Sequence, residues 1–151
     1  MRAALACALD AEARGNLPIG CVIVLDNAIL TRGSNGIFRP DYAPLRHAEM
    51  VALAAIAGTA LRTRSRDMTL YSTLEPCLMC FGAATVARIG RVVFGAADPD
   101  GGVRTLAQLE AGGYTAEPLP QLEAGIMQIE CDALFERARV AFRSYPRAQL
   151  G

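Results

Sequence analysis

The feature that most restricts how this chain can fold is a pair of short motifs whose side chains have to meet. His47 is the only histidine, and it begins the triplet His47-Ala48-Glu49. The second motif, Pro76-Cys77-Leu78-Met79-Cys80, follows further along the chain. One imidazole and two thiolates provide three ligands of a tetrahedral zinc site and leave the fourth position to water. The sequence therefore predicts one Zn²⁺ per chain, held by His47, Cys77 and Cys80.

Glu49 adds a carboxylate beside this predicted zinc site. It follows the histidine by two residues and is not needed as a ligand, so it would stand next to the bound water. A carboxylate in that place can take a proton from water, pass it to a ring nitrogen of a bound heterocycle and later protonate departing ammonia. We therefore predict that Glu49 is the catalytic acid and base.

Each motif taken alone has an ordinary explanation. A Cys-x-x-Cys pair after a strand can form a redox disulfide of the thioredoxin type, and a histidine near a helix start is usually structural. Here a proline precedes the first cysteine, and Leu78 and Met79 between the cysteines are apolar. A closed structural zinc site would also have no use for Glu49. Together the motifs favour catalytic zinc over a redox pair or a structural site.

Length and composition fit one compact domain covering residues 1–151. Hydrophobic residues make up 52% and charged residues 20%, so we expect a packed core rather than disorder. No apolar stretch has the length of a transmembrane helix, and the first residues lack the apolar core of a cleaved leader. We therefore expect a cytoplasmic protein without membrane contact.

A net charge of zero and a pI near 6.6 argue against a large basic surface for nucleic acid.

The cysteines and arginines outside the motifs have simpler interpretations. Five cysteines are an odd number, which argues against a disulfide framework. We expect Cys7, Cys21 and Cys131, which lie in apolar patterns, to be buried as small hydrophobic residues. All fifteen basic residues are arginines, which we interpret as compositional bias rather than as phosphate-binding forks. The arginine-containing connection over residues 61–67 is accordingly expected to be a solvated turn.

Hydrophobic periodicity, glycines and prolines predict alternating strands and helices. A hairpin comes first and helix–strand units follow, which favours a layered α/β domain with a mixed sheet covered on both faces. The predicted strands are Cys21–Leu25, Ile29–Gly33, Met68–Leu74, Arg91–Gly95 and a poorly defined one between Tyr114 and Leu119. The predicted helices are Ala3–Ala13, Ala48–Ala57, Pro76 to about Arg88, a weaker one over Val103–Glu110, and Ile129–Phe142, with a frayed end after Ser144.

The two motifs fall at the starts of two of these predicted helices. A helix start carries a partial positive charge, which favours thiolate over thiol. Ligand sites in open α/β sheets lie outside the strand ends, where such helix starts converge. We therefore expect zinc to join the first turn of one helix to that of the other.

With these residues in view, the chain resembles the cytidine/deoxycytidylate deaminase superfamily, whose signature is His-x-Glu followed by Pro-Cys-x-x-Cys. The branch of bacterial tRNA-specific adenosine deaminases and guanine deaminases looks most similar. The resemblance extends from about Leu17 to Phe142 and is densest over residues 73–84 and 88–98. It implies a three-layer α/β/α sandwich with a five-stranded mixed sheet. It also implies a homodimer in which the neighbouring chain helps to shape the pocket.

The resemblance also implies substrate contacts. The zinc ligands and Glu49 keep the roles given above, and Asn35 would hydrogen-bond the base. Taken alone, Ser34-Asn35-Gly36 is also a common turn sequence. Ala48 and Phe81 are expected to border the substrate.

Three segments depart from the family pattern. Pro44-Leu45-Arg46-His47 stands where both subfamilies have Pro-Thr-Ala-His, and the loop before it looks about one residue longer. Arg46 is therefore beside the site, where it either contacts the substrate or points to solvent. Asn16 stands where the tRNA enzymes tend to have an acidic residue, and the last helix lacks their paired phenylalanines and basic run.

These observations leave two substrates and one non-enzymatic function open. The sequence favours hydrolytic deamination of a free base or nucleoside that is purine-like, because the net charge is zero and the last helix is altered. The alternative is a tRNA wobble-adenosine deaminase acting on the anticodon loop, which the match over residues 88–98 favours. Such an enzyme needs a cationic rim and salt-sensitive RNA binding. A non-catalytic zinc-stabilised module is the third interpretation, and Glu49 argues against it.

Overall fold

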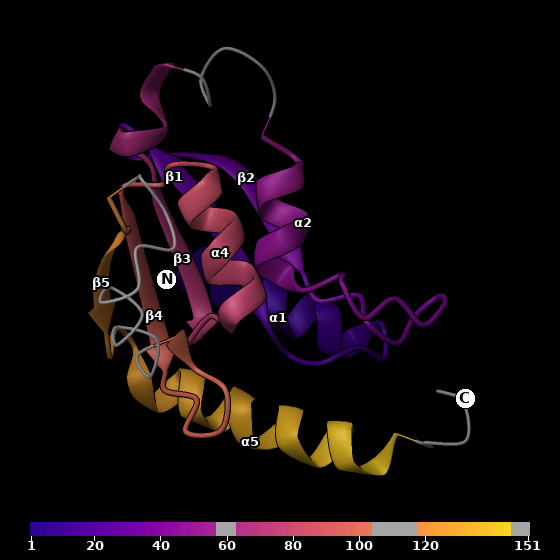
Figure 1. Ribbon diagram of the computed structural model, residues 1–151. Coiled ribbons are helices and arrows are strands. Elements are labelled where there is room, and N and C mark those ends of the chain that lie inside the picture. The colour runs from indigo at the N-terminus through magenta and orange to yellow at the C-terminus, as the bar shows by residue number, and fades with distance from the viewer. Residues whose placement is uncertain (57–62, 104–117, 146–151) are drawn as a thin grey trace.

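A five-stranded mixed sheet forms the centre of the molecule (Figure 1). The computed structural model describes residues 1–56, 63–103 and 118–145. The strands are β1 (Gly20–Leu25), β2 (Ala28–Ser34), β3 (Thr69–Leu74), β4 (Arg91–Ala96) and β5 (Gln121–Ala124). Their order in the sheet is β2-β1-β3-β4-β5. β1 pairs antiparallel with β2 and β3, whereas β3, β4 and β5 run parallel to one another.

Helices cover both faces of this sheet, which confirms the predicted three-layer α/β/α sandwich. α1 packs on β1 and β2, and α5 packs on the same face over β4, while α2 and α4 lie side by side on the opposite face (Figure 1). Within the described residues, no helix combines the length and apolar character that crossing a membrane requires. The helices are α1 (Arg2–Ala13), α2 (Ala48–Ala54), α4 (Leu78–Val86) and α5 (Gln128–Ser144), and a short 3-10 helix spans Ser65–Asp67.

The apolar run of β1 is explained by this double cover. Successive side chains of a strand point to opposite faces. Cys21 and Ile23 accordingly belong to the core between the sheet and α2 and α4, whereas Val22 packs with Ala4 and Cys7 of α1. A strand buried on both faces has no polar side, so its sequence reads as continuously hydrophobic. The predicted burial of all three non-motif cysteines is confirmed.

The fifth strand lies later in the chain than predicted. We expected it between Tyr114 and Leu119; residues 114–117 lie outside the described residues, and the strand spans Gln121–Ala124. It is an edge strand whose side chains are mostly exposed, so the polar Gln121 and Glu123 replace the apolar run that marks a buried strand. The helix predicted over Val103–Glu110 also lies almost entirely outside the described residues.

The ends of the other elements differ from prediction by a few residues. The helix predicted over Ala48–Ala57 ends at Ala54. The connection predicted as a solvated turn contains Arg64, which is exposed and pairs with Asp26 at 2.6 Å. The last helix begins at Gln128 and continues to Ser144.

A glycine allows the helix that carries the first motif to approach the sheet closely. A Cβ atom at Gly33 of β2 would overlap the carbonyl oxygen of Ala48 and lie 2.8 Å from the nitrogen of Ala52. Any side chain there would push α2 away from β2. The first turn of α2 is thus held against the sheet, at the same end of the sheet at which β3 leads into α4.

Candidate metal centre and active site

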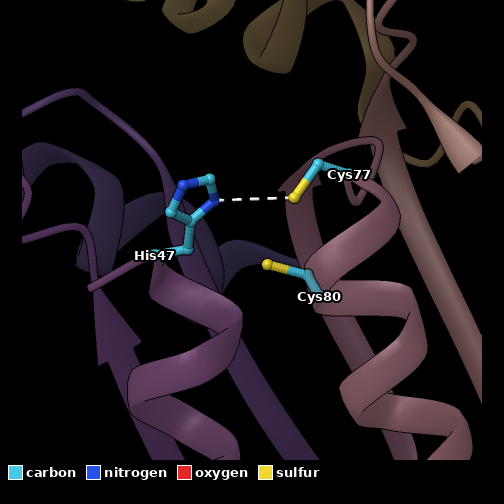
Figure 2. Close-up of side chains that lie close together, drawn as sticks. All are labelled: His47, Cys77 and Cys80. Carbon is cyan, nitrogen blue, oxygen red and sulfur yellow. Dashed lines mark hydrogen bonds between the residues drawn. The ribbon is translucent and has the colours of Figure 1, made fainter. Parts of the chain in front are cut away.

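His47, Cys77 and Cys80 come together between the starts of α2 and α4 (Figure 2). Their ligand atoms all lie within 4.8 Å of one another, and His47 Nδ1 is 3.8 Å from Cys77 Sγ. His47 and Cys77 each occupy the extended position immediately before a helix. Cys80 is three residues further on, so its side chain lies on the same helix face as Cys77. The predicted meeting of the two motifs is confirmed.

The spacing and chemistry of these groups fit zinc. With zinc–sulfur bonds near 2.3 Å and zinc–nitrogen bonds near 2.0 Å, tetrahedral geometry places the two donor atoms about 3.5 Å apart. The observed 3.8 Å between His47 Nδ1 and Cys77 Sγ is close to this value. In the described part of the chain, the group of candidate ligands comprises three side chains. Three protein ligands are typical of catalytic zinc, which keeps its fourth position for water or substrate.

The local electrostatics favour the ligand form of the first cysteine. A hydrogen bond from the Cys80 thiol, assisted by His47, lowers the pKa of Cys77 to about 4, although partial burial opposes the shift. The hydrogen bond between His47 and Cys77 in turn raises the pKa of His47. The thiolate is the form that binds metal, and the start of a helix favours it further.

Glu49 lies beside the ligands, in the first turn of α2. Its side chain is 3% exposed; Oε1 accepts a hydrogen bond of 2.7 Å from the Ser72 hydroxyl, and Oε2 is 3.5 Å from Cys80 Sγ. Burial raises the pKa of the Glu49 carboxyl, and the hydrogen bond from Ser72 opposes this shift. The carboxylate is therefore enclosed and fixed at one oxygen.

Asn35 follows β2 and carries an unsatisfied donor. It is 1% exposed, and its Oδ1 accepts a hydrogen bond of 3.2 Å from the backbone of Ile37. Its Nδ2 has no hydrogen-bond partner within the described residues. Buried amide groups are nearly always paired, so an orphaned one needs an explanation. A bound ligand with an acceptor atom would provide the missing partner.

The other predicted substrate residues occupy different surroundings. Ala48 is fully buried at the start of α2, and Phe81 is buried in α4, where its carbonyl accepts a hydrogen bond from Thr85. The side chain of Arg46 is exposed, while its carbonyl accepts a hydrogen bond of 2.9 Å from the nitrogen of Gly36. Arg46 and the segment after Asn35 are thus neighbours.

Sequence reasoning missed Ser72, which holds Glu49 in place. Ser72 is fully buried in β3 and lies on the same face as Leu70, which packs in the core beneath α2. A signal was present, because a serine stands where the alternation of the strand calls for an apolar residue facing the helix. It could not be recognised without knowing that this face meets Glu49.

Comparison with known proteins finds deaminases, both among family models and among individual relatives. Residues 1–96 match the cytidine and deoxycytidylate deaminase zinc-binding region. The tRNA-specific adenosine deaminase of Bacillus subtilis is 36% identical over 138 residues, covering 89% of this chain and 83% of the relative. The protein of the same name from Streptococcus pyogenes serotype M1 is 39% identical over 122 residues, covering 78% and 68%.

Solved structures share the fold. A structure from work on A-to-I editing by tRNA:A34 deaminases at the wobble position of transfer RNA is 33% identical, with a TM-score of 0.73, and covers 89% of this chain and 96% of that one. A guanine deaminase from Nitrosomonas europaea has a TM-score of 0.67 at 20% identity, covering 91% and 81%, which is a likeness of fold. With the matched family region and the zinc ligands in place, the chain belongs to the cytidine and deoxycytidylate deaminase family of zinc-dependent enzymes.

Proposed function

We propose that the protein is a tRNA-specific adenosine deaminase, which converts adenosine in an anticodon loop to inosine with release of ammonia. The observation that carries the proposal is the 36% identity to the Bacillus subtilis protein of that name over 89% of this chain. The sequence alone favoured a free base or nucleoside as substrate. The similarity to relatives named for tRNA supports the alternative better than that preference.

In this proposal His47, Cys77 and Cys80 hold the zinc ion. When bound there, zinc supplies a polarised water whose pKa falls to about 7. Glu49 exchanges the protons, and we assign this to Oε2, because Oε1 is held by Ser72 while Oε2 faces the ligand Cys80 at 3.5 Å. Glu49 protonates a ring nitrogen of adenine and then the departing amino group. Water supplies the new oxygen, the carbon–nitrogen bond breaks and ammonia leaves.

Binding of the base is assigned to the residues that surround this carboxylate. A duplex or stacked loop hides the amino group, so the target base has to leave its stack and enter the pocket. We propose that Asn35 donates its unpartnered Nδ2–H to an acceptor atom of the base. Ala48 and Phe81 contribute apolar wall, and the burial of Glu49 keeps bulk water from the proton that it transfers.

A substrate comparison tests this function. Purified zinc-loaded protein is offered an anticodon stem-loop RNA with adenosine at the wobble position, and separately guanine, adenine, cytosine and their nucleosides. We expect ammonia and inosine to form in equal amounts with the stem-loop. Ammonia from guanine or another free base, with none from the RNA, would contradict the proposal and restore the preference for a small substrate.

We also propose that the enzyme works as a homodimer, as the family resemblance implies. Leu78 and Val86 of α4 are 56% and 80% exposed and lie about two turns apart on the helix, so they offer apolar surface to a partner chain. Light scattering coupled to size-exclusion chromatography is expected to give the mass of two 16.0-kDa chains. A mass of one chain at micromolar concentration would contradict this.

A further inference from the structure

A cavity lined by four arginines lies next to the segment that carries Asn35 and Arg46. Its volume is about 510 Å³, and its walls come from the end of α1, from β2 and from the connection between β2 and α2. Asn35 lies in its wall, and Arg46 directly precedes the zinc ligand His47. We call this cavity the arginine pocket. Its arginines are Arg14, Arg32, Arg39 and Arg46.

Three of these arginines carry uncompensated charge. Arg14 pairs with Asp10 at 2.6 Å. Arg32, Arg39 and Arg46 form no ion pair with a carboxylate in the described parts of the chain. Several guanidinium groups elsewhere on the described surface are paired: Arg64 with Asp26, Arg91 with Glu123 and Arg137 with Glu12. In a chain of zero net charge, positive charge is thus concentrated at this pocket.

The backbone that presents two of these arginines is held in place. Asn16 is 6% exposed, and its Oδ1 accepts hydrogen bonds of 2.8 Å from the nitrogen of Phe38 and 2.9 Å from that of Arg39. The Gly36 nitrogen donates to the Arg46 carbonyl at 2.9 Å. Because these backbone positions are fixed before any ligand arrives, less ordering is required when one binds.

The chemistry of the pocket matches a phosphate group. A guanidinium presents its N–H groups as a planar fork that fits two oxygens of one phosphate. Several such forks around one cavity suit an anion with oxygens on all sides. The neighbouring Asn35 has a free amide donor, so a ligand that places a base at Asn35 would bring its sugar-phosphate chain toward the arginines.

We propose that the arginine pocket binds a backbone phosphate of the RNA strand, close to the nucleotide whose base enters the zinc site. This inference rests on the proposed function, because it takes RNA as the substrate. It gives Arg46 a role in substrate binding rather than a place in solvent. It also provides the local positive charge that the zero net charge of the chain conceals.

Salt-dependent RNA binding tests the pocket. Zinc-loaded wild-type protein is compared with the triple variant Arg32→Gln, Arg39→Gln, Arg46→Gln, using a fluorescent anticodon stem-loop and anisotropy. Each phosphate contact with a single strand contributes about 0.7 to the slope of log K against log salt, so loss of the one proposed phosphate contact lowers the magnitude of the slope by about 0.7. We expect the variant to bind at least about tenfold more weakly at about 0.1 M salt.

A control variant removes the same charge from the other end of the sheet. Arg64→Gln, Arg66→Gln and Arg91→Gln lie where β3 and β4 begin, away from the zinc ligands. We expect this variant to bind RNA within about twofold of wild type and to keep its slope. Zinc content and unfolding temperature, measured for both variants, should match wild type. Equal weakening by both variants, or an unchanged slope in the pocket variant, would overturn the proposal.

Two further measurements separate the possible failures. Adenosine monophosphate and inorganic phosphate serve as competitors at constant ionic strength, and we expect both to displace the stem-loop far less effectively than unlabelled stem-loop. If adenosine monophosphate competes as well as RNA, the occupant is a mononucleotide and the assignment to an RNA backbone is wrong. If wild type binds the stem-loop with the expected slope but forms no inosine, the proposed function fails and the pocket stands. If the pocket variant binds RNA and forms inosine as wild type does, the pocket proposal fails and the proposed function stands.

Discussion

Glu49 owes its position beside the zinc ligands to two different elements. Its own helix brings it to the site, and the Ser72 hydroxyl of β3 fixes one oxygen at 2.7 Å. A carboxylate that is buried and held in this way loses little freedom when it transfers a proton. The proposed proton carrier and the side chain that orients it therefore have separable effects.

Glu49→Gln removes the proton carrier and keeps the shape of the side chain. We expect the variant to retain zinc and fold, because the ligand group does not include Glu49, while deamination falls by at least about a hundredfold. Zinc stoichiometry, circular dichroism and inosine formation are the measurements. Activity close to wild type would show that the proton transfer has been assigned to the wrong residue.

Ser72→Ala tests positioning rather than chemistry. The Glu49 oxygen loses its donor, so we expect kcat to fall about 10–100-fold with little change in KM, as is usual for groups that orient an active-site residue. Ser72→Thr keeps the hydroxyl and should recover part of kcat. Ser144→Ala, at an exposed serine near the end of α5, is the matched control and should leave kcat unchanged. Equal kcat in Ser72→Ala and wild type would contradict the positioning role.

At this scale the sequence predicted the metal centre but not its surroundings. His47, Cys77 and Cys80 were predictable because few arrangements of one imidazole and two thiols at helix starts serve any other purpose. Ser72 and the unpartnered Nδ2 of Asn35 were not, because serine and asparagine occur in strands and turns for many reasons. Their importance depends on which side chain lies opposite, and that is a property of the folded chain.

Among the elements, the contact between α2 and β2 fixes the position of the helix that begins after the zinc ligand His47. Gly33→Ala places a Cβ against the carbonyl oxygen of Ala48. Because both partners are backbone, the strain cannot be relieved by a side-chain rotation. We expect the free energy of unfolding to fall by about 1–3 kcal/mol, measured by urea denaturation.

Gly82→Ala is the control for this substitution. A Cβ at Gly82 in α4 meets no atom within 4 Å. Alanine is the better helix former, so we expect the free energy of unfolding to rise by as much as about 1 kcal/mol. The critical outcome is that the free energy of unfolding falls for Gly33→Ala and rises for Gly82→Ala. If Gly33→Ala also stabilised the protein, the close approach of α2 to β2 would be wrong.

Prediction of the elements succeeded where burial imposes a pattern. β1 has an apolar run because both of its faces are covered, and α5 has its buried residues Cys131, Leu134 and Ala138 at helical spacing. β5 is an edge strand with mostly exposed side chains, so no hydrophobic alternation marked its position. Short exposed strands are placed by their pairing partner, here β4, and pairing is not visible in a single sequence.

For the molecule as a whole, zinc is expected to join the two helices that supply its ligands. Removing the metal leaves His47 and the two cysteines without their common partner, and stability provided by a bound ligand is lost when the ligand is withdrawn. We expect a strong chelator to lower the free energy of unfolding by at least about 2.7 kcal/mol, the value for a ligand at a hundred times its dissociation constant. Thermal unfolding with and without chelator measures this.

Adding zinc back should restore the original unfolding temperature, and Cys80→Ser should make the temperature insensitive to chelator. An unfolding temperature that is the same with and without chelator in wild type would mean that the metal contributes nothing to the fold. It would not by itself affect the assignment of Glu49. The two properties are thus tested independently.

Overall charge was one ground for the sequence-based preference for a small substrate, and the structure shows what such a sum leaves out. The fifteen acidic and fifteen basic residues cancel in the total, yet they do not cancel locally. Arg64, Arg91 and Arg137 are neutralised by neighbouring carboxylates, whereas the arginine pocket keeps three guanidinium groups without such partners among the described residues. Which charges pair is decided by the fold, so a sum over the sequence says little about one face.

The aromatic ring of Phe38 stacks on that of Tyr145 at 3.9 Å between centroids. Phe38 stands between Asn35 and Arg39, while Tyr145 follows the last turn of α5, so residues more than a hundred positions apart share one contact. A change in the last helix can therefore reach the loop that borders the catalytic pocket without touching the zinc ligands. In this architecture, a substitution in α5 can shift the loop that carries Asn35 while the metal-binding residues stay unchanged.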